Sequence, residues 1–312
     1  MKFSKAVLVN ISESDLDQKY WQQIDELVES RIFIKRDDPN LTAELKDADC
    51  LMLGFQVPTD KDIFDAAPNL KLVSILATAY GTVNLDIAKQ RGIPVCNLAG
   101  YSTEAVAEFT IAILLHQIRQ FEEGLARGKA GNYDFAGLSA RELKNSQFGV
   151  VGLGNIGNRV AELAAGFGAN VSYWSRSKKD VPFTYKELNK LLAESDYISV
   201  NVAQTPDTEG LFNAETLALV KPGTVIINTV PPEIFDTDAL AVRLAKDDIA
   251  YVSDHADEMS PENLAKLKDL KNCLLLPAIA FITQEARVNK QEIFVGNLKA
   301  VLEGKPQNNQ AN

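Results

Sequence analysis

A glycine-spaced segment, Gly152-Leu153-Gly154-Asn155-Ile156-Gly157, constrains the fold of this chain more than any other feature. It directly follows the apolar run Gly149–Val151 and opens a helical pattern that ends near Gly166–Gly168. In that context the first glycine permits a tight turn, the second lets backbone approach a pyrophosphate, and the third lets helix and strand pack closely. Backbone N–H groups near Asn155 and Ile156 would then hold the phosphates. The segment predicts a dinucleotide site; the alternative is a tight turn that binds no ligand.

Short apolar runs alternate with longer amphipathic stretches along the chain. The runs predicted to be strands are Val7–Asn10, Cys50–Gly54, Leu72–Leu76 and Pro94–Asn97, then Phe148–Val151, Asn170–Trp174, Tyr197–Val202, Thr224–Asn228, Tyr251–Asp254 and Cys273–Leu276. The helical patterns between the later runs are Asn158–Phe167, Lys186–Ala193, Ala214–Val220 and Asp236–Lys246. This alternation predicts an α/β protein with right-handed βαβ units and parallel sheets that are covered on both faces.

A long apolar helix separates the two series of strands. The hydroxyl residues Ser102 and Thr103 are suited to its N-terminus, and the helix is predicted to run through Phe121. The glycine-rich stretch Gly124–Gly137 is expected to be a surface excursion. We expect the polar tail, residues 304–312, to fray.

The size and charge of the chain limit the number of domains and the kinds of partner that we expect. At 312 residues it is long enough for two domains. Its net charge of −10 repels phosphate backbones, so we expect no nucleic-acid partner. No apolar run reaches the ~18–20 residues that cross a bilayer, so we expect no membrane partner. Three scattered cysteines, Cys50, Cys96 and Cys273, lack metal-ligand spacing and are typical of a reducing compartment. We therefore expect a cytoplasmic protein without a metal.

The residues after the run Asn170–Trp174 bear on the choice of dinucleotide. A site for NAD places Asp or Glu about 20 residues beyond the glycines, where the carboxylate binds the ribose 2′-hydroxyl. This chain has Ser175-Arg176-Ser177 there, with Lys178 close by. Without the carboxylate a 2′-phosphate is not repelled, and the hydroxyls and guanidinium can donate to it. The pattern favours NADP, with NAD as the alternative; the basic residues could also simply solvate a loop.

Several ordered segments together resemble one enzyme family. They are Leu72–Asp86, Arg91–Asn97, Tyr101–Glu108, the glycine segment, Thr205–Leu211 and Thr283–Ala286. In this order they resemble the D-isomer-specific 2-hydroxyacid dehydrogenases over almost the whole chain. The resemblance implies two doubly wound parallel-sheet domains: a Rossmann domain over residues 100–281, and a flavodoxin-like substrate domain formed by residues 1–99 and 282–312. It also implies a homodimer joined largely by the nucleotide domain.

The same resemblance implies a set of cofactor-binding residues and a small-molecule substrate such as a 2-oxo acid. The cofactor set is Thr103, Gly152, Gly154, Asn155, Ile156, Gly157, Ser175, Arg176, Ser177, Val202, Ala203, Thr208, Thr229, Val230 and Asp254. In the family, the residue that matches Asp254 reaches the nicotinamide end. The loop that contains Tyr80 resembles the family's carboxylate cradle, in which backbone N–H groups bind the substrate.

The catalytic positions of the family are occupied by other residues in this chain. The family uses Arg to bind the substrate carboxylate and carbonyl, His to move the proton, and Glu to tune that His. The matching positions hold Pro231 for Arg, Ala278 for His, and Met259 for Glu, or Glu258 if the loop shifts by one residue. Proline and alanine can neither bind a carboxylate nor move a proton, so the resemblance implies a retained cofactor site without the standard chemistry.

Three residues are candidate substitutes for the missing groups. His255 follows Asp254, but neighbouring residues on a strand point to opposite faces, so we expect it to point away from the nicotinamide. Tyr80 and Tyr101 flank the expected substrate site and are candidate hydrogen-bond donors. Three functions stay open: a reductase for a more reactive carbonyl or imine, a dinucleotide-binding sensor, scaffold or partner subunit without catalysis, and ordinary dehydrogenase activity with substitute residues.

Overall fold

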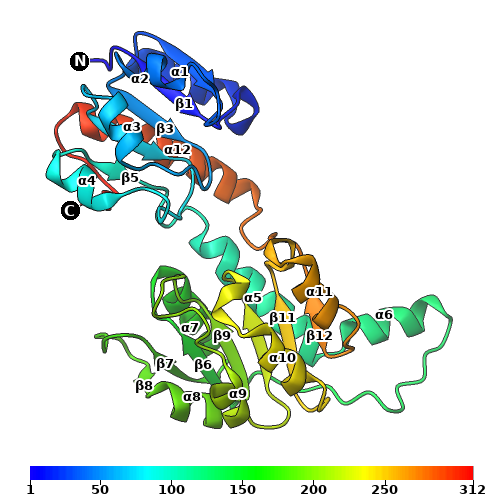
Figure 1. The fold of residues 1–312 in the computed structure, drawn as a ribbon. Coiled ribbons are helices and arrows are strands. Elements are labelled where there is room, and N and C mark those ends of the chain that lie inside the picture. The colour runs from blue at the N-terminus through cyan, green and yellow to red at the C-terminus, as the bar shows by residue number, and fades with distance from the viewer. Residues whose placement is uncertain (312) are drawn as a thin grey trace. The chain divides into compact units, whose positions relative to one another are not determined.

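The computed structural model describes residues 1–311, which form two compact units (Figure 1). The terminal unit contains Met1–Ser102 and the chain from Thr283 onward, and the central unit contains Thr103–Ile282. The boundaries inferred from the sequence, after residues 99 and 281, lie close to these. No helix among the described residues is long and apolar enough to cross a membrane.

The terminal unit is built on a five-stranded parallel sheet with strand order β2-β1-β3-β4-β5. Its strands are β1 Ala6–Val9, β2 Arg31–Ile34, β3 Cys50–Leu53, β4 Leu72–Ile75 and β5 Val95–Cys96. Its helices are η1 Glu13–Asp15, α1 Gln18–Leu27, α2 Leu41–Leu45, α3 Lys61–Ala66, α4 Leu85–Gln90 and α12 Gln284–Leu302. One apolar cluster packs α2, α3 and α4 on one face of the sheet, and another packs α1 and α12 on the opposite face.

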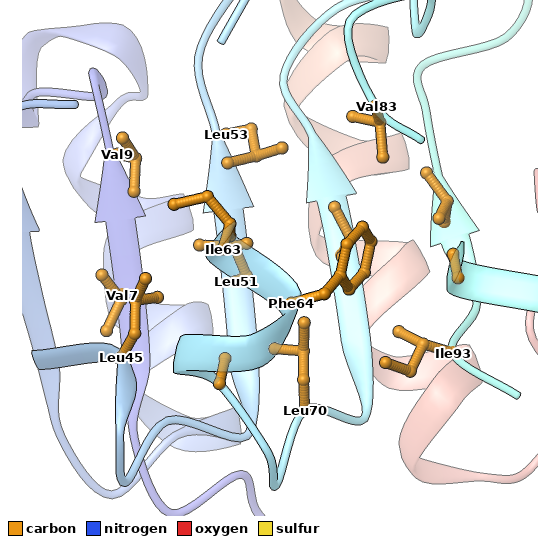
Figure 2. Packing of buried hydrophobic residues seen from close by; sticks show 14 of the residues in the cluster. Val7, Val9, Leu45, Leu51, Leu53, Ile63, Phe64, Leu70, Val83 and Ile93 are labelled. Atoms are coloured by element: carbon orange, nitrogen blue, oxygen red, sulfur yellow. The ribbon is translucent and has the colours of Figure 1, made fainter. Parts of the chain in front are cut away.

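Side chains alternate between these two clusters along β1, as a pleated strand requires. Val7 and Val9 belong to the cluster under α2 and α3, where Phe64 lies at the centre (Figure 2). Ala6 and Leu8 belong to the cluster under α1 and α12. Burial on both faces explains why this strand is a continuous apolar run in the sequence.

The central unit is built on a seven-stranded parallel sheet with strand order β12-β11-β10-β9-β6-β7-β8. Its strands are β6 Gln147–Val151, β7 Asn170–Trp174, β8 Thr184–Tyr185, β9 Tyr197–Val200, β10 Val225–Asn228, β11 Ala250–Ser253 and β12 Cys273–Leu275. Its helices are α5 Thr103–Ile118, α6 Phe121–Lys129, α7 Asn155–Gly166, α8 Leu188–Glu194, α9 Ala214–Leu219, η2 Pro232–Ile234, α10 Thr237–Leu244, η3 Ala256–Glu258 and α11 Pro261–Leu267. The strand order reverses between β6 and β9, and ligands bind at such a switch point in doubly wound folds.

Each run that the sequence predicts to be a strand overlaps an observed strand, and two strands have no counterpart among the predictions. β2 was missed because its residues are all half-buried and its run, Arg31–Ile34, begins with a charge. β8 was missed because it is two residues long at the edge of its sheet.

One of two expectations about the less regular segments is wrong. The stretch Gly124–Gly137 is exposed almost throughout, as expected of a surface excursion, and α6 includes its first part, Gly124–Lys129. The tail does not fray over its described part: the Gln310 N–H donates to the Val95 carbonyl at 2.8 Å, and Ala311 is buried in the apolar cluster under α3. Asn312 lies outside the described residues.

Candidate functional site

The turn after β6 has the geometry that its glycines predict. Gly152 has φ +99°, a conformation that favours glycine, and a Cβ there would lie 2.8 Å from the backbone of Asn201 and Val202. A Cβ on Gly157 would lie 1.9 Å from the Gly152 carbonyl oxygen. A Cβ on Gly154, in contrast, would meet no atom within 4 Å. Two glycines are therefore needed by the fold itself, and the third leaves an open space beside the turn.

The N-terminus of α7 presents backbone donors at this open space. The first helical hydrogen bond runs from the Asn158 N–H to the Gly154 carbonyl at 2.9 Å. Within residues 1–311, the N–H groups of Asn155, Ile156 and Gly157 have no acceptor. Because the helix is twelve residues long and its dipole is positive at this end, these donors form a site suited to an anion.

The end of β7 is joined to the glycine turn. The Gly152 N–H donates to the Trp174 carbonyl at 2.8 Å, which brings the residues after β7 next to the turn. Ser175 is half-buried, and its Oγ donates to the Ser177 carbonyl at 2.6 Å. Arg176 is exposed and has no ion-pair partner in the described part of the chain. Its guanidinium is thus available to a ligand.

The loop that follows β9 is held by its own hydroxyl groups. Thr208 Oγ1 donates to the Ala203 carbonyl at 2.7 Å and accepts from the Thr205 N–H at 2.8 Å. Val202, at the start of this loop, is buried. Just before it, the buried Asn201 Oδ1 has no hydrogen-bond partner among residues 1–311. Sequence reasoning missed Asn201, although a polar residue directly after a buried strand at the switch point was a usable signal.

The loop that follows β10 carries Pro231. Asn228 Nδ2 donates to the Val230 carbonyl at 2.8 Å, while the Asn228 Oδ1 is buried and unpaired in the described structure. Thr229 Oγ1 donates to the Val200 carbonyl at 3.4 Å, which links this loop to the end of β9. Pro231 is half-buried and directly precedes η2. The resemblance expects a positively charged side chain at this position. The side chain of Pro231 has neither a charge nor a hydrogen-bond donor.

Two carboxylates fix the backbone of the loop that follows β12. Asp254 is fully buried, and its Oδ1 accepts the N–H groups of Ile279 at 3.0 Å and Ala280 at 3.1 Å. Burial raises the pKa of Asp254, and these two hydrogen bonds oppose that rise. Asp257 Oδ1 accepts the Ala278 N–H at 2.8 Å. The loop is therefore held at three successive residues, although its side chain at position 278 is only a methyl group.

Two other candidate residues, His255 and Glu258, lie close to each other just after β11. His255 Nδ1 lies 3.2 Å from Glu258 Oε1 but makes no well-formed hydrogen bond with it or with other described residues. Asp254 is directed at the loop after β12, so these neighbours have different surroundings. Met259 packs against the apolar cluster of the central unit that includes Phe235. No described group of three or more His, Cys, Asp or Glu residues is placed to hold a metal ion.

In the terminal unit, the loop over residues 78–82 presents free backbone donors. None of its five successive N–H groups has an acceptor among residues 1–311. Tyr80, at the middle of the loop, is 38% exposed. Tyr101 is half-buried against the cluster under α12, and burial raises the pKa of its hydroxyl. Thr103, the last of the expected cofactor residues, is the first residue of α5.

Known proteins share this sequence pattern and this fold. The model of the D-isomer specific 2-hydroxyacid dehydrogenase NAD binding domain matches residues 111–280, more than half of the chain. The chain belongs to this family. A hydroxypyruvate reductase from Blautia hydrogenotrophica is 30% identical, with 96% of each chain covered. A glyoxylate reductase from Thermococcus litoralis is 32% identical, over 85% of this chain and 83% of the relative.

A solved structure of the family confirms the predicted fold class. D-lactate dehydrogenase from Aquifex aeolicus, crystallised with NAD and lactic acid, matches with a TM-score of 0.82 at 26% identity, over 96% of each chain. The matched domain lies inside the central unit, so the glycine turn after β6 is part of the family's NAD-binding domain. The predictions of the family and of a dinucleotide-binding domain are thereby confirmed.

Proposed function

We propose that this protein is an NADP-dependent oxidoreductase that transfers hydride to or from a small carbonyl compound bearing a carboxylate, without the family's Arg and His pair. The observation that carries the proposal is the turn after β6. It combines open space at Gly154 with three unpaired N–H groups at the start of α7. These donors suit a pyrophosphate, and no protein group competes for them in the described structure.

The residues around the switch point fit a dinucleotide. Besides the turn, the buried oxygens of Asn201 and Asn228 lack partners in the described chain and are available to hydrogen-bond a ligand. Val202, Ala203, Thr208, Thr229 and Val230 belong to the loops that would line the site. When bound, the nicotinamide supplies or accepts the hydride. Asp254 would lie toward the nicotinamide end, as the resemblance implies.

NADP rather than NAD is the cofactor we propose. The position of the ribose-binding carboxylate holds Ser175, and the exposed Arg176 lacks an ion pair within residues 1–311. A 2′-phosphate would gain charge-assisted hydrogen bonds from Arg176 and the hydroxyls of Ser175 and Ser177. Titration followed by nicotinamide fluorescence tests this. NADPH should bind tighter than NADH, and equal affinities or tighter NADH would reject the preference.

The loop over residues 78–82 is the substrate-binding element we propose in the terminal unit. Its five unpaired N–H groups are donors of the kind that hold a carboxylate, such as that of a 2-oxo acid. Neither Pro231 nor Ala278 can donate a hydrogen bond from its side chain to the carbonyl oxygen. The substrate would therefore be a carbonyl or imine reactive enough to accept hydride without that help.

A second candidate function, dinucleotide binding without catalysis, is favoured by the same substitutions. Met259, which the resemblance places at the third catalytic position, packs against an apolar cluster and cannot titrate; a shift of the loop by one residue would place Glu258 there instead. Assays with NADPH against a panel of oxo acids and preformed imines would separate the two functions. Turnover of any member supports the reductase, and tight NADPH binding with no turnover across the panel supports the sensor or scaffold.

We also propose a homodimer in a reducing compartment, the cytoplasm. The segment around α6 exposes large apolar side chains, namely Phe121, Leu125, Tyr133, Phe135 and Leu138. Such a surface suits burial against a second copy, in line with the family resemblance. The three cysteines are free thiols, which supports the proposal of a reducing compartment. Light scattering should give twice the 34.2 kDa chain mass, and a monomer at micromolar concentration would reject the dimer.

A further inference from the structure

The C-terminal segment, residues 308–311, lies along the free edge of the terminal unit's sheet. β5 is the last strand of that sheet (Figure 1). Asn309 forms an antiparallel bridge with Cys96. The Gln310 N–H donates to the Val95 carbonyl at 2.8 Å, and Asn309 Oδ1 accepts the Val95 N–H at 3.0 Å. Ala311 is 8% exposed and packs into the apolar cluster. The segment thus covers an edge that would otherwise present unpaired backbone groups.

Asn97, directly after β5, is where this segment meets the rest of the unit. It is 2% exposed, and both its backbone groups and both its side-chain atoms are hydrogen-bonded. Its N–H donates to the Asn308 carbonyl at 3.3 Å, and its carbonyl accepts from Asn297 Nδ2 at 2.9 Å. Its Oδ1 accepts from Gln310 Nε2 at 3.1 Å. Its Nδ2 donates to the Thr78 carbonyl at 2.6 Å.

The loop over residues 78–82 is therefore fixed at both ends. At its far end, Val83 is buried in the apolar cluster (Figure 2). Val83 also forms a parallel bridge with Thr59. At its near end, the bond from Asn97 holds the Thr78 carbonyl. The Thr78 carbonyl and the Ala79 N–H belong to one planar peptide group, in which they point in opposite directions. Holding the Thr78 carbonyl from one side directs the Ala79 N–H, one of the free donors of the loop, to the other side.

We propose that Asn97 is a positioning residue for the loop over residues 78–82, and that the C-terminal segment 308–311 holds Asn97 in the orientation this requires. The tail then sets how well the loop presents its N–H groups to a carboxylate. The inference rests on the proposed function for the role of the loop. The mechanical link from tail to loop rests only on the hydrogen bonds of the terminal unit.

Two substitutions break the link at different points. Asn97→Asp keeps an oxygen that accepts from Gln310 but removes the donor to Thr78. Gln310→Ala removes the bond to Asn97 and leaves Asn97's own donor in place. Asn69→Asp makes the same chemical change at an exposed residue of the same unit, where Asn69 Nδ2 donates to the Lys46 carbonyl at 3.4 Å, and serves as a control.

Chymotrypsin cleavage in the presence of NADPH measures the loop directly. Tyr80 reports on the loop, and Tyr133, which is 85% exposed in the central unit, is a reference within the same molecule. Losing one hydrogen bond should raise cleavage at Tyr80 by about fivefold in Asn97→Asp, with a smaller rise in Gln310→Ala. Cleavage at Tyr133 should not change, and Asn69→Asp should match the wild type.

The outcomes separate a rise in cleavage that depends on the link from a rise throughout the molecule. Unchanged cleavage at Tyr80 in both Asn97→Asp and Gln310→Ala would overturn the proposal, as would an equal rise at Tyr80 and Tyr133. If Asn97→Asp does not fold, Gln310→Ala tests the proposal alone: unchanged cleavage at Tyr80, or an equal rise at Tyr80 and Tyr133, would overturn it. A rise at Tyr80 in the control Asn69→Asp would also overturn it, because the effect would then not depend on the link.

Oxalate, a small dicarboxylate, distinguishes failure of the link from failure of the proposed function. It should protect Tyr80 from cleavage in the wild type, and Asn97→Asp should need several-fold more oxalate for the same protection. If oxalate protects neither protein while Asn97→Asp still exposes Tyr80, the link holds and the carboxylate-binding role of the loop fails. If oxalate protects both proteins equally, the link does not control binding and the proposal is overturned.

Discussion

The turn after β6 and the loops after β10 and β12 lie at the same edge of one sheet, yet they are built differently. The first works through its backbone, and its glycines also serve the fold, since a Cβ on Gly157 would lie 1.9 Å from the Gly152 carbonyl oxygen. At the other two loops the family's chemistry depends on single side chains, and we propose that Pro231 and Ala278 stand at those positions in this chain. Two glycines of this backbone site are therefore needed by the fold, whereas the hydrogen bonds that hold the loop after β12 do not involve the side chain at position 278.

The loop after β12 illustrates this separation. Asp254 and Asp257 hold the backbone N–H groups of residues 278–280, so the loop is fixed without any contribution from the side chain of Ala278. The backbone of this loop is thus held in place at the position that we propose to match the family's His, where the side chain is only a methyl group.

The largest effect expected from this contrast is in turnover. Glyoxylate, hydroxypyruvate and pyruvate should be reduced at least about 10²-fold more slowly than the ~10 s⁻¹ median of enzymes. In the assignment we propose, Pro231 and Ala278 stand where the family has its Arg and His, so the oxyanion and proton-transfer roles are both missing, and such groups act as a unit. Steady-state assays with saturating NADPH would measure this. A kcat near the median on any of the three acids would refute the inference and point to His255, Tyr80 or Tyr101.

The next effect compares two glycines of the same turn. Gly157→Ala should lower the free energy of unfolding by about 1–3 kcal/mol, because its Cβ would clash with backbone. Gly154→Ala should leave stability unchanged, since Gly154 has φ −83° and its Cβ meets no atom within 4 Å. It should nevertheless weaken NADPH binding at least about tenfold, because the methyl occupies the space proposed for the pyrophosphate. Urea unfolding and fluorescence titration of both variants measure the two effects; unchanged binding in Gly154→Ala would place the cofactor elsewhere.

The contrast also explains what could be predicted from the sequence. Glycine spacing at 152, 154 and 157 and the apolar runs gave the dinucleotide turn and the central sheet, because backbone geometry and burial restrict residue type strongly. The docking of the tail was not predictable in this way. Its polar residues are typical of a frayed end, and only the tertiary contacts of Asn97 and Gln310 pair their amides. The half-buried edge strand Arg31–Ile34 was missed for a related reason, since partial burial leaves a weak apolar pattern.

A smaller effect concerns the 2′ end of the cofactor. Ser175→Asp should weaken NADPH binding about tenfold and strengthen NADH binding, because a carboxylate repels the 2′-phosphate and accepts from the 2′-hydroxyl. Ser14→Asp adds the same charge at an exposed position in the terminal unit and should change neither affinity. If Ser175→Asp and Ser14→Asp behave alike, Ser175 does not lie at the ribose.

The smallest effect expected is a dependence of stability on pH through Asp254. Burial raises the pKa of Asp254, so between its ordinary and its raised pKa the folded protein binds more protons than the unfolded chain. Stability from this group therefore falls as the pH rises through that window. In the variant Asp254→Asn, the side-chain amide oxygen would still accept the N–H groups of Ile279 and Ala280, but the side chain cannot ionise. The free energy of unfolding of the wild type minus that of Asp254→Asn should thus decrease as the pH rises from about 4 toward neutrality and then level off. Urea unfolding across that range measures the difference. A difference that increases with pH would mean that the hydrogen bonds to the carboxylate outweigh its burial, and that this loop is held by a charge that the fold favours.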